Sequence, residues 1–274
     1  MSTAGMVVPG PAIPGFRFVR PLGMGGFADV YLYHQALPSR DVAIKIVRAQ
    51  GDARGTEELH READAMTLLA GHPAVVELHG VGTTSDGRAY LVMEYVEGPN
   101  LRDLMAAGPL SVREALGLTA QILRPLGAAH RAGLVHRDIK PENVLLPADG
   151  SVAKVADFGL ARAVTEVTQT TTGNVLGTVA YLAPELITSG TSSPRADLFS
   201  VGIIVYELLT GEQPFAADAP IQIAFRNVHE DIPRPSALVP DLPAAVDEIV
   251  SAMTQRDPEL RPRDADEALA LLRK

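Results

Sequence analysis

The sequence contains no cysteine, which excludes disulfide bonds and thiolate metal sites. Any bound metal would therefore be a hard cation with oxygen ligands. The longest apolar run, at 201–209, is too short to span a bilayer and contains Glu207. The N-terminal stretch has neither a basic region nor a continuous apolar core, so it does not resemble a signal peptide. We therefore expect a cytoplasmic chain with no membrane segment, and a flexible lead-in at 1–14.

Positive charge is also scarce, since 24 lysines and arginines face 33 aspartates and glutamates, for a net charge of −9. No basic stretch stands out, so we do not expect nucleic acid to be a partner. Hydrophobic residues make up 46% and charged residues 21% of the chain, an ordinary balance for a globular protein with a sizeable core. The length of 274 residues suits one large domain or two lobes.

The N-terminal third has the pattern of strands with a single helix. The helix is predicted at 56–70, where apolar residues recur at helical spacing. The stretch EGPN, at 97–100, interrupts the strand pattern and is interpreted as a hinge. The predicted strands lie at 16–23, 28–35, 41–47, 79–84 and 88–96.

The remainder is predicted to be mostly helical. Ser111 and Glu114 form a capping box before a helical pattern in which Pro125 predicts a kink or a local end. The stretch 196–211 is apolar on nearly every face and closes with Gly211, which indicates a buried helix. A β-rich first third and a helical remainder predict two lobes with a cleft at the hinge. Further helices are predicted near 219–228, 243–255 and 264–273, and short strand-like pieces at 134–138, 143–146 and 152–157.

Glycines are concentrated between the first two predicted strands, in LGMGGFADV. Gly23, Gly25 and Gly26 would let backbone N–H groups approach phosphate oxygens closely. Glycines also make plain hairpin turns, so this stretch alone is weak support for an anion site.

A lysine and a glutamate are predicted to pair next to this loop. Lys45, in the strand VAIK, would in isolation extend to solvent. The helix that follows places Glu62 within its apolar stripe, where a carboxylate needs a cation. Lys45 is the natural partner, and the pair would hold the ammonium against an anionic ligand.

Charged residues are concentrated in LVHRDIKPENVLL, between two apolar runs. Taken singly, they are explained by an exposed salt bridge or an Asn turn. Taken together, Asn143 and Asp157 of the following DFG offer oxygen ligands that suit Mg²⁺ holding substrate phosphates. Asp138 is then available to orient and deprotonate a hydroxyl, and Lys140 to neutralise charge on a transferring phosphoryl group.

These motifs resemble those of the eukaryotic-type protein kinases, and most of all the bacterial serine/threonine protein kinases. The resemblance covers roughly residues 15–272 and depends on the glycine loop, VAIK, HREA, HRDIKPEN, DFG, APE and DLFSVG in the family's order. It implies an α+β, bilobal fold, with a β-rich N-lobe containing one main helix at 15–93, a hinge at 94–98 and a mostly helical C-lobe at 99–274. Ala28 replaces the family's third loop glycine, and we expect little loss from it.

The resemblance further implies a serine/threonine protein kinase that transfers the γ-phosphate of Mg²⁺-ATP to proteins, with Mn²⁺ as an alternative ion. Asp138 would be the catalytic base, acting with Lys140 and Lys45, and Asn143 and Asp157 would bind the metal. His136 is expected to be structural, because the family transfers its proton through the aspartate. The implied ATP-binding residues are Leu22, Gly23, Gly25, Gly26, Val30, Ala43, Lys45, Glu62, Met93, Glu94, Val96 and Leu145.

Regulation and substrate binding are implied for the segment from DFG to APE. Arg137 would bind this segment once autophosphorylation has placed a phosphate on it. Thr178 would contact the catalytic Asp and Lys, Glu185 would pair with Arg261, and Asp197 would brace the catalytic loop. The threonines of the segment are Thr165, Thr168, Thr170, Thr171 and Thr172, of which Thr170 and Thr172 match the usual sites and Thr168 competes with them.

Two other classes of function remain open on the sequence. One is a pseudokinase that binds partners without transfer, which the complete set Lys45, Asp138, Asn143 and Asp157 argues against. The other is a small-molecule phosphotransferase, a class that lacks the GT…APE segment. Relatives often dimerise through the N-lobe and continue into a membrane helix and a sensor domain, so an N-lobe homodimer and a longer, membrane-anchored protein are hypotheses for this chain.

Overall fold

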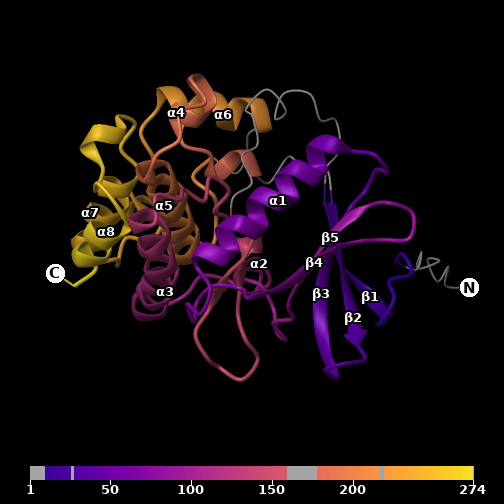
Figure 1. Cartoon of the computed structure of the whole chain (residues 1–274). Coiled ribbons are helices and arrows are strands. Elements are labelled where there is room, and N and C mark those ends of the chain that lie inside the picture. Colours follow the sequence, from indigo (N-terminus) through magenta and orange to yellow (C-terminus); the bar gives the residue numbers. More distant parts are fainter. Residues whose placement is uncertain (1–9, 26–27, 159–177, 216–218, 274) are drawn as a thin grey trace, which may run out of the picture. The chain divides into compact units, whose positions relative to one another are not determined.

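The computed structural model describes residues 10–25, 28–158, 178–215 and 219–273. The chain divides into two compact units (Figure 1). Unit 1 comprises Met1–Ala70 and Val76–Val96, and unit 2 comprises Gly71–Val75 and Glu97–Lys274. Unit 1 contains an antiparallel sheet and unit 2 consists mostly of helices, which confirms the predicted fold class.

Unit 1 contains an antiparallel five-stranded sheet in the order β1-β2-β3-β5-β4. All five strands fall close to the predicted stretches. Most of them are rich in β-branched or aromatic residues, whereas β4, LHGVGT, contains two glycines. Every residue of β3 from Val42 onward is buried, as expected for the strand at the centre of the sheet. The strands are β1 Phe16–Met24, β2 Ala28–Gln35, β3 Arg40–Val47, β4 Leu78–Thr83 and β5 Ala89–Glu94.

Helix α1, Ala53–Leu68, packs against the sheet of unit 1. It begins three residues earlier than the predicted 56, because the Asp52 side chain accepts a hydrogen bond from the Gly55 N–H at 2.9 Å and caps the helix. Its buried face includes Leu59, Glu62 and Met66. A carboxylate therefore lies within the apolar stripe, as the sequence pattern indicated.

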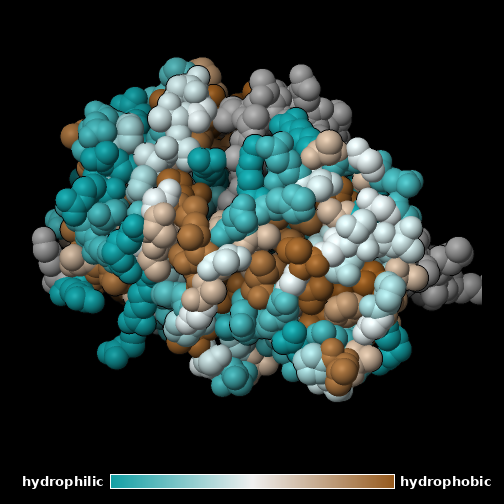
Figure 2. Space-filling model, viewed as in Figure 1, coloured by the Kyte–Doolittle hydropathy of each residue, from teal (hydrophilic) through white to brown (hydrophobic). Residues whose placement is uncertain are grey.

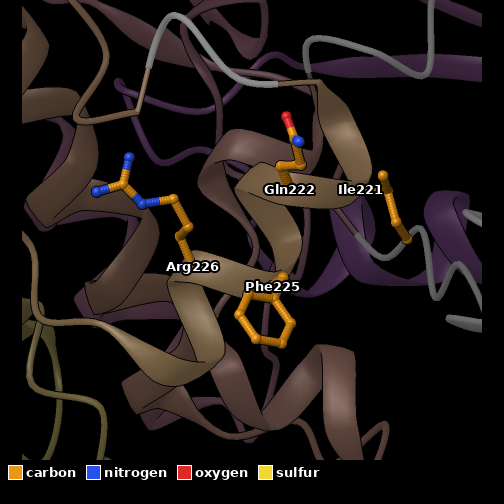
Figure 3. A pocket seen from close by; sticks show the side chains of 4 residues that line it. All are labelled: Ile221, Gln222, Phe225 and Arg226. Atoms are coloured by element: carbon orange, nitrogen blue, oxygen red, sulfur yellow. The ribbon is translucent and has the colours of Figure 1, made fainter.

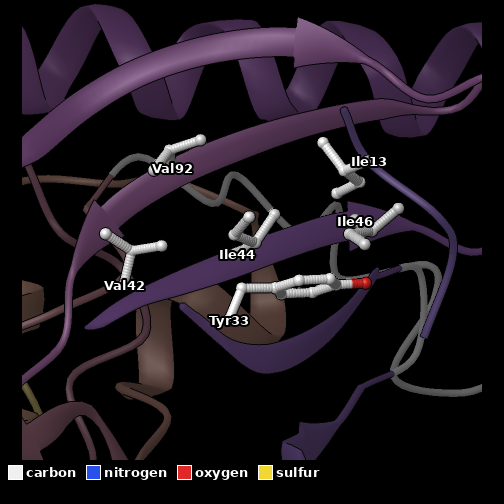
Figure 4. Close-up of a cluster of buried hydrophobic side chains, with 6 residues drawn as sticks. All are labelled: Ile13, Tyr33, Val42, Ile44, Ile46 and Val92. Atoms are coloured by element: carbon white, nitrogen blue, oxygen red, sulfur yellow. The ribbon is translucent and has the colours of Figure 1, made fainter. Parts of the chain in front are cut away.

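The apolar core of unit 1 gathers on one face of the sheet. Alternation along β3 places Val42, Ile44 and Ile46 together on that face. Tyr33 packs against them and donates its hydroxyl to the Pro11 carbonyl at 2.7 Å. Figure 4 shows the whole cluster, which also includes Ile13 and Val92.

Residues 10–14 differ from the flexible lead-in that we expected over 1–14. Ile13 is buried with only 4% exposure, and its carbonyl accepts a hydrogen bond from the Phe16 N–H at 3.1 Å. The physical reason is that Ile13 packs in the apolar cluster with Tyr33 and the residues of β3, which removes its side chain from water. Residues 1–9 lie outside the described residues.

Unit 2 is built around α5, Pro194–Thr210, which is buried on every face and ends at Gly211 in the left-handed conformation. Helices α3, α7 and α8 pack against it, and the surface over α7 and α8 is mostly hydrophilic on the face shown in Figure 2. A two-stranded sheet pairs β6, Val144–Leu145, with β7, Lys154–Val155. The other helices are α2 Leu101–Met105, α3 Val112–Arg131, α4 Pro184–Thr188, α6 Pro220–His229, α7 Ala244–Met253 and α8 Ala265–Leu271.

Two details of unit 2 differ from the sequence patterns. Helix α3 begins at the predicted Ser111 capping box but does not end at Pro125, and it continues to Arg131. Pro125 lacks the N–H that would bond to the Gln121 carbonyl, and the buried side chains on both sides of it hold the helix together. The stretch 134–138 is not a strand, because its backbone bonds to a buried carboxylate instead of a neighbouring strand. In the part of the chain that the structure describes, no helix has both the length and the apolarity that a bilayer requires.

We predict that Ile44→Ala destabilises the chain by about 2–5 kcal/mol, because it leaves a cavity in the fully buried cluster of Figure 4. The matched control is Leu37→Ala, whose side chain is 87% exposed and which should change the free energy of unfolding by about 0.5 kcal/mol or less. Urea denaturation of both variants measures the difference. Equal effects would contradict the assignment of the core.

Candidate active site

Lys45 and Glu62 form a buried ion pair within unit 1. The Lys45 Nζ lies 2.7 Å from Glu62 Oε2 and 3.0 Å from Oε1. Lys45 is 3% exposed and Glu62 is fully buried. A buried pair gains little stability over apolar residues, but loss of one partner leaves an uncompensated charge. The arrangement therefore fixes an ammonium group at one place on the sheet.

The residues predicted to surround ATP in unit 1 share one face of the sheet with Lys45. Val30 is opposite Lys45 in the β2–β3 register, and Ala43 is opposite Met93 in the β3–β5 register. Directly paired residues point to the same face, so these side chains lie on the face opposite to the apolar cluster of Figure 4. Glu94 ends β5, and Val96, the last residue of unit 1, follows it.

The glycine-rich hairpin joins β1 to β2. The Gly25 N–H donates to the Ala28 carbonyl at 3.1 Å. A Cβ at Gly25 would lie 2.5 Å from that same carbonyl oxygen, so only glycine fits. Leu22 and Gly23 lie in β1 before this turn, and Gly26 lies outside the described residues.

Asp29 is a residue of this hairpin that our sequence reasoning missed. The residue is 8% exposed. Its carboxylate accepts hydrogen bonds from the Gly25 N–H at 3.3 Å and from Arg48 Nε at 2.8 Å, and lies 3.4 Å from the Tyr31 hydroxyl. Burial and the Asp29 carboxylate both raise the pKa of Tyr31. The sequence signal that could have identified Asp29 is the alternation along β2, which places its carboxylate on the same face as Tyr31 and Tyr33. Asp29 ties the glycine turn to the two strands that follow it.

The catalytic-loop residues come together in unit 2. Lys140 Nζ lies 2.6 Å from Asp138 Oδ2, and Asn143 Nδ2 donates to the Asp138 carbonyl at 2.8 Å. Asp138 and Asn143 are both buried, at 8% and 5% exposure. The Asn143 amide nitrogen is thus used within the loop, and its oxygen is the atom suited to a cation.

The His136 side chain makes hydrogen bonds that stabilise the structure of this loop. Its Nε2 donates to the Ala156 carbonyl at 2.9 Å, so its Nδ1 is the acceptor for the Asp138 N–H at 3.3 Å. Both ring nitrogens are used and the side chain is fully buried, which leaves the imidazole no role as a base.

Asp197, on the first turn of α5, fixes the backbone of the catalytic loop. Its Oδ2 accepts from the His136 N–H at 2.9 Å and its Oδ1 from the Arg137 N–H at 2.8 Å. Arg137 has a φ of 70°, a left-handed conformation that a non-glycine residue rarely adopts. The buried carboxylate holds the loop in this strained conformation.

His130 was also missed from the sequence. Its Nδ1 accepts from the Ala265 N–H at 3.3 Å, so Nε2 is the nitrogen that donates to Asp197 Oδ2, at 2.9 Å. The residue lies near the end of α3, where a histidine is typical of a helix C-terminus and gives no specific signal. It links α3 and α8 to the carboxylate that holds the loop.

Asp157 lies two residues after the end of β7 and also has a positive φ, of 62°. The β6–β7 pairing places its loop beside the catalytic loop, because the Ala156 N–H donates to the Asn143 carbonyl at 2.9 Å. Among the described residues, no group of three or more His, Asp or Glu is arranged to hold a metal ion. Asn143 and Asp157 carry side-chain oxygens, the type of ligand that Mg²⁺ prefers, and Mg²⁺ commonly binds to few protein oxygens and keeps water and phosphate ligands.

Glu185 and Arg261 form the ion pair that the sequence suggested. The two guanidinium nitrogens of Arg261 lie 2.7 and 2.8 Å from the two Glu185 carboxylate oxygens. Arg261 also lies over the Phe199 ring of α5, 5.0 Å from its centroid. The pair joins α4 to the C-terminal part of unit 2.

A second polar cluster near the catalytic loop was not predicted. Arg102 lies 2.5 Å from Glu207 and donates to Glu142 at 3.0 Å, and its guanidinium also contacts the Tyr181 hydroxyl. Burial, and then the Glu207 carboxylate, raise the pKa of Tyr181 well above its usual range, so this tyrosine stays a neutral donor. Arg102 lies on α2, for which the sequence gave no prediction.

The remaining predicted residues are placed as follows. Leu145 lies in β6 and is partly buried, and Thr178 begins the turn Thr178–Tyr181. Arg137 is exposed and donates from Nε to Ser192 Oγ at 2.9 Å. Thr165, Thr168, Thr170, Thr171 and Thr172 lie outside the described residues.

Comparison with known proteins agrees with this fold. The family model described as "Protein kinase domain" matches residues 16–271, which is most of the chain. The chain therefore belongs to the protein kinase family, as the sequence motifs indicated.

The relatives to which the chain is similar are named as bacterial serine/threonine protein kinases. Serine/threonine-protein kinase PknL of Mycobacterium tuberculosis (strain H37Rv) is 43% identical over 248 residues, which cover 89% of this chain and 61% of PknL. Serine/threonine-protein kinase PrkC of Bacillus subtilis is 38% identical over 255 residues, 92% of this chain and 39% of PrkC. The probable serine/threonine-protein kinase pknA2 of Bifidobacterium longum is 42% identical over 255 residues, 91% of this chain and 33% of the relative. The chain thus spans one to two thirds of the length of these relatives.

We predict that Arg261→Met destabilises unit 2 by about 3–5 kcal/mol, because the Glu185 carboxylate, only 11% exposed, loses its cation. The double variant Glu185→Leu/Arg261→Met should recover part of the loss, since no unpaired charge remains while the carbonyls of Arg195, Gln255 and Arg256 still lose their donor. Thermal or urea denaturation of the single and double variants measures this coupling. Strictly additive losses would contradict a coupled ion pair.

Proposed function

We propose that this domain transfers the γ-phosphate of Mg²⁺-ATP to serine or threonine hydroxyls of proteins. The observation that carries the proposal is the catalytic loop, in which Asp138, Lys140 and Asn143 converge on a backbone fixed by the buried Asp197. Family membership and the serine/threonine class of the relatives support it.

In unit 1, we assign ATP binding to the face of the sheet that carries Lys45. The Lys45 ammonium, oriented by Glu62, would contact the α- and β-phosphates. The N–H groups of the hairpin at Gly23, Gly25 and Gly26 would cover the phosphates. Within unit 1, the adenine would contact Leu22, Val30, Ala43 and Met93, and the backbone of Glu94–Val96.

In unit 2, we assign the chemistry to the catalytic loop. Asp138 would accept the proton of the substrate hydroxyl as that oxygen attacks the γ-phosphorus. Lys140, 2.6 Å from Asp138, would stabilise negative charge on the transferring group. Asn143 and Asp157 would hold Mg²⁺, which supplies charge neutralisation of the phosphates when bound; Mn²⁺ has the same preference for oxygen ligands.

Regulation is part of the same proposal. Phosphorylation of Thr168, Thr170 or Thr172 would give Arg137 an anionic partner and so order the segment. Thr178, at the end of that segment, would contact Asp138 and Lys140. The domain would be cytoplasmic, and its substrates would be proteins. An N-lobe homodimer would bring one copy close to the 165–172 segment of the other.

We predict that Asp138→Asn abolishes transfer to a general protein substrate and to the chain itself, because the base is lost while the fold remains. Lys45→Met should also lower activity strongly, and it should weaken ATP binding. Transfer of ³²P from Mg²⁺-ATP, with phosphosites mapped by mass spectrometry, measures both. Binding of ATP without any transfer by the wild-type chain would favour a pseudokinase.

A second prediction concerns the hairpin anchor. Asp29→Asn should raise the KM for ATP several-fold with a smaller change in kcat, because the turn that would cover the phosphates loses its carboxylate anchor. Arg48→Met should have the same effect, since the Asp29 carboxylate loses its partner. Steady-state kinetics at varied ATP concentration measures the split. A fall in kcat with an unchanged KM would contradict the role of Asp29.

A further inference from the structure

The backbone of Arg137 is fixed within the catalytic loop, but its guanidinium has a neutral hydrogen-bond partner. Its backbone is fixed by the hydrogen bond to Asp197 and by the left-handed φ of 70°. Its Nε donates to the Ser192 hydroxyl at 2.9 Å, and Ser192 is the partner of this guanidinium in the part of the chain described here. A guanidinium has five N–H donors arranged in a fork that matches carboxylates and phosphates.

Ser192 lies in the short connection between α4 and α5, at 190–193, and is partly exposed. The hydroxyl of Ser189 in this region bonds to the Glu185 carbonyl at 2.9 Å and to Thr191 at 2.8 Å. Ser193 is the N-cap of α5 but its side chain makes no capping bond. Ser192 is thus the hydroxyl of this connection that the structure places against a cation.

We propose that Ser192 is a phosphorylation site of this chain, and that its phosphate binds Arg137. A phosphate on Ser192 Oγ would replace one neutral hydrogen bond with charge-assisted bonds to the same guanidinium. The negative charge of this phosphate would meet no like charge within the connection, because residues 190–193 include no aspartate or glutamate.

The inference rests on the proposed function for the source of the phosphate. In the transfer, the bond between the γ-phosphorus and the β–γ bridging oxygen of ATP breaks, and a bond from Ser192 Oγ to that phosphorus forms. ADP leaves with the electron pair. The serine proton passes to Asp138 of the copy that acts as the enzyme.

The consequence is competition for one side chain. Arg137 is also the group that we assign to the phosphorylated segment at 165–172. A guanidinium occupied by phosphoserine 192 is withdrawn from that role. Phosphorylation of Ser192 therefore lowers activity, whereas phosphorylation of the segment raises it.

The first experiment tests whether the site is used. The wild-type chain and Asp138→Asn are incubated with Mg²⁺-ATP beside casein as a general substrate. Fragment ions then locate phosphate within the tryptic peptide that ends at Arg195. We expect phosphate on Ser192 in the wild type only. Transfer to casein without phosphate on Ser192 overturns this inference and leaves the proposed function intact, whereas absence of all transfer contradicts the proposed function as well.

The second experiment tests the contact and does not require kinase activity. Phosphoserine is installed at 192 during translation, and at 193 in a matched control, and each phosphate is titrated by ³¹P NMR. Phosphoserine has a second pKa of about 6. We expect Arg137 to lower that pKa at 192 by about one unit, which is a tenfold change in the protonation equilibrium.

Arg137→Gln should remove this shift at 192, and Arg137→Lys, which keeps the charge but not the fork, should keep part of it. The titration at 193 should not respond to either change. A pKa at 192 that is indifferent to Arg137 overturns the proposed contact. Circular dichroism shows that each variant is folded, and turnover of casein by the phosphoserine 192 protein should be lower than that of Ser192→Ala.

Discussion

The structure of unit 2 depends on one buried carboxylate. Asp197 lies on a helix that is buried on every face, and it is itself fully buried. A lone carboxylate there would be costly, but three donors satisfy it, namely the backbone N–H groups of His136 and Arg137 and the imidazole of His130. Because the buried carboxylate needs these hydrogen bonds, the loop that contains Asp138 is restricted to the conformation in which the N–H groups of His136 and Arg137 point to Asp197.

In unit 1 as well, buried charged groups are satisfied by pairing. Lys45 and Glu62 are both buried, and each is acceptable there only in the presence of the other. The strand register then places the side chains of Val30, Ala43 and Lys45 on one face of the sheet, while the apolar cluster fills the other. In both units, polar groups in the core are fixed by pairing, and the fixed groups are those to which we assign chemistry.

On helix α6, by contrast, apolar side chains are exposed and a polar side chain is buried. Ile221 and Phe225 lie one turn apart on this helix, are 70% and 61% exposed, and line a pocket with Gln222 and Arg226 (Figure 3). Asn227 on the same helix is buried and donates to the Ala180 carbonyl at 3.2 Å. The helix is therefore anchored by a polar residue on its inner side and carries apolar residues on its outer side.

Much of the fold follows from sequence patterns. The five strands, the Ser111 capping box and the buried helix α5 each have a period or a cap that a single sequence displays. The pairing of Lys45 with Glu62 followed from a carboxylate within an apolar stripe. Other features depend on contacts between distant segments: the continuation of α3 through Pro125, the bond from His130 to Asp197 and the Arg102 cluster join residues whose own neighbourhoods look ordinary. Ile13 was missed because its partners, Tyr33 and β3, come together only in the folded sheet.

The most direct test of this account is hydrogen exchange at the amides of His136 and Arg137 in Asp197→Asn, measured together with phosphoryl transfer. An asparagine replaces one of the two acceptor oxygens with an NH₂ group, which is a donor, so one of the two backbone N–H groups loses its acceptor at the observed position. The account predicts a folded protein in which at least one of the two loop amides exchanges faster than in the wild type and whose transfer activity falls in parallel. Unchanged exchange at both amides, with activity retained, would show that the buried carboxylate does not hold the catalytic loop.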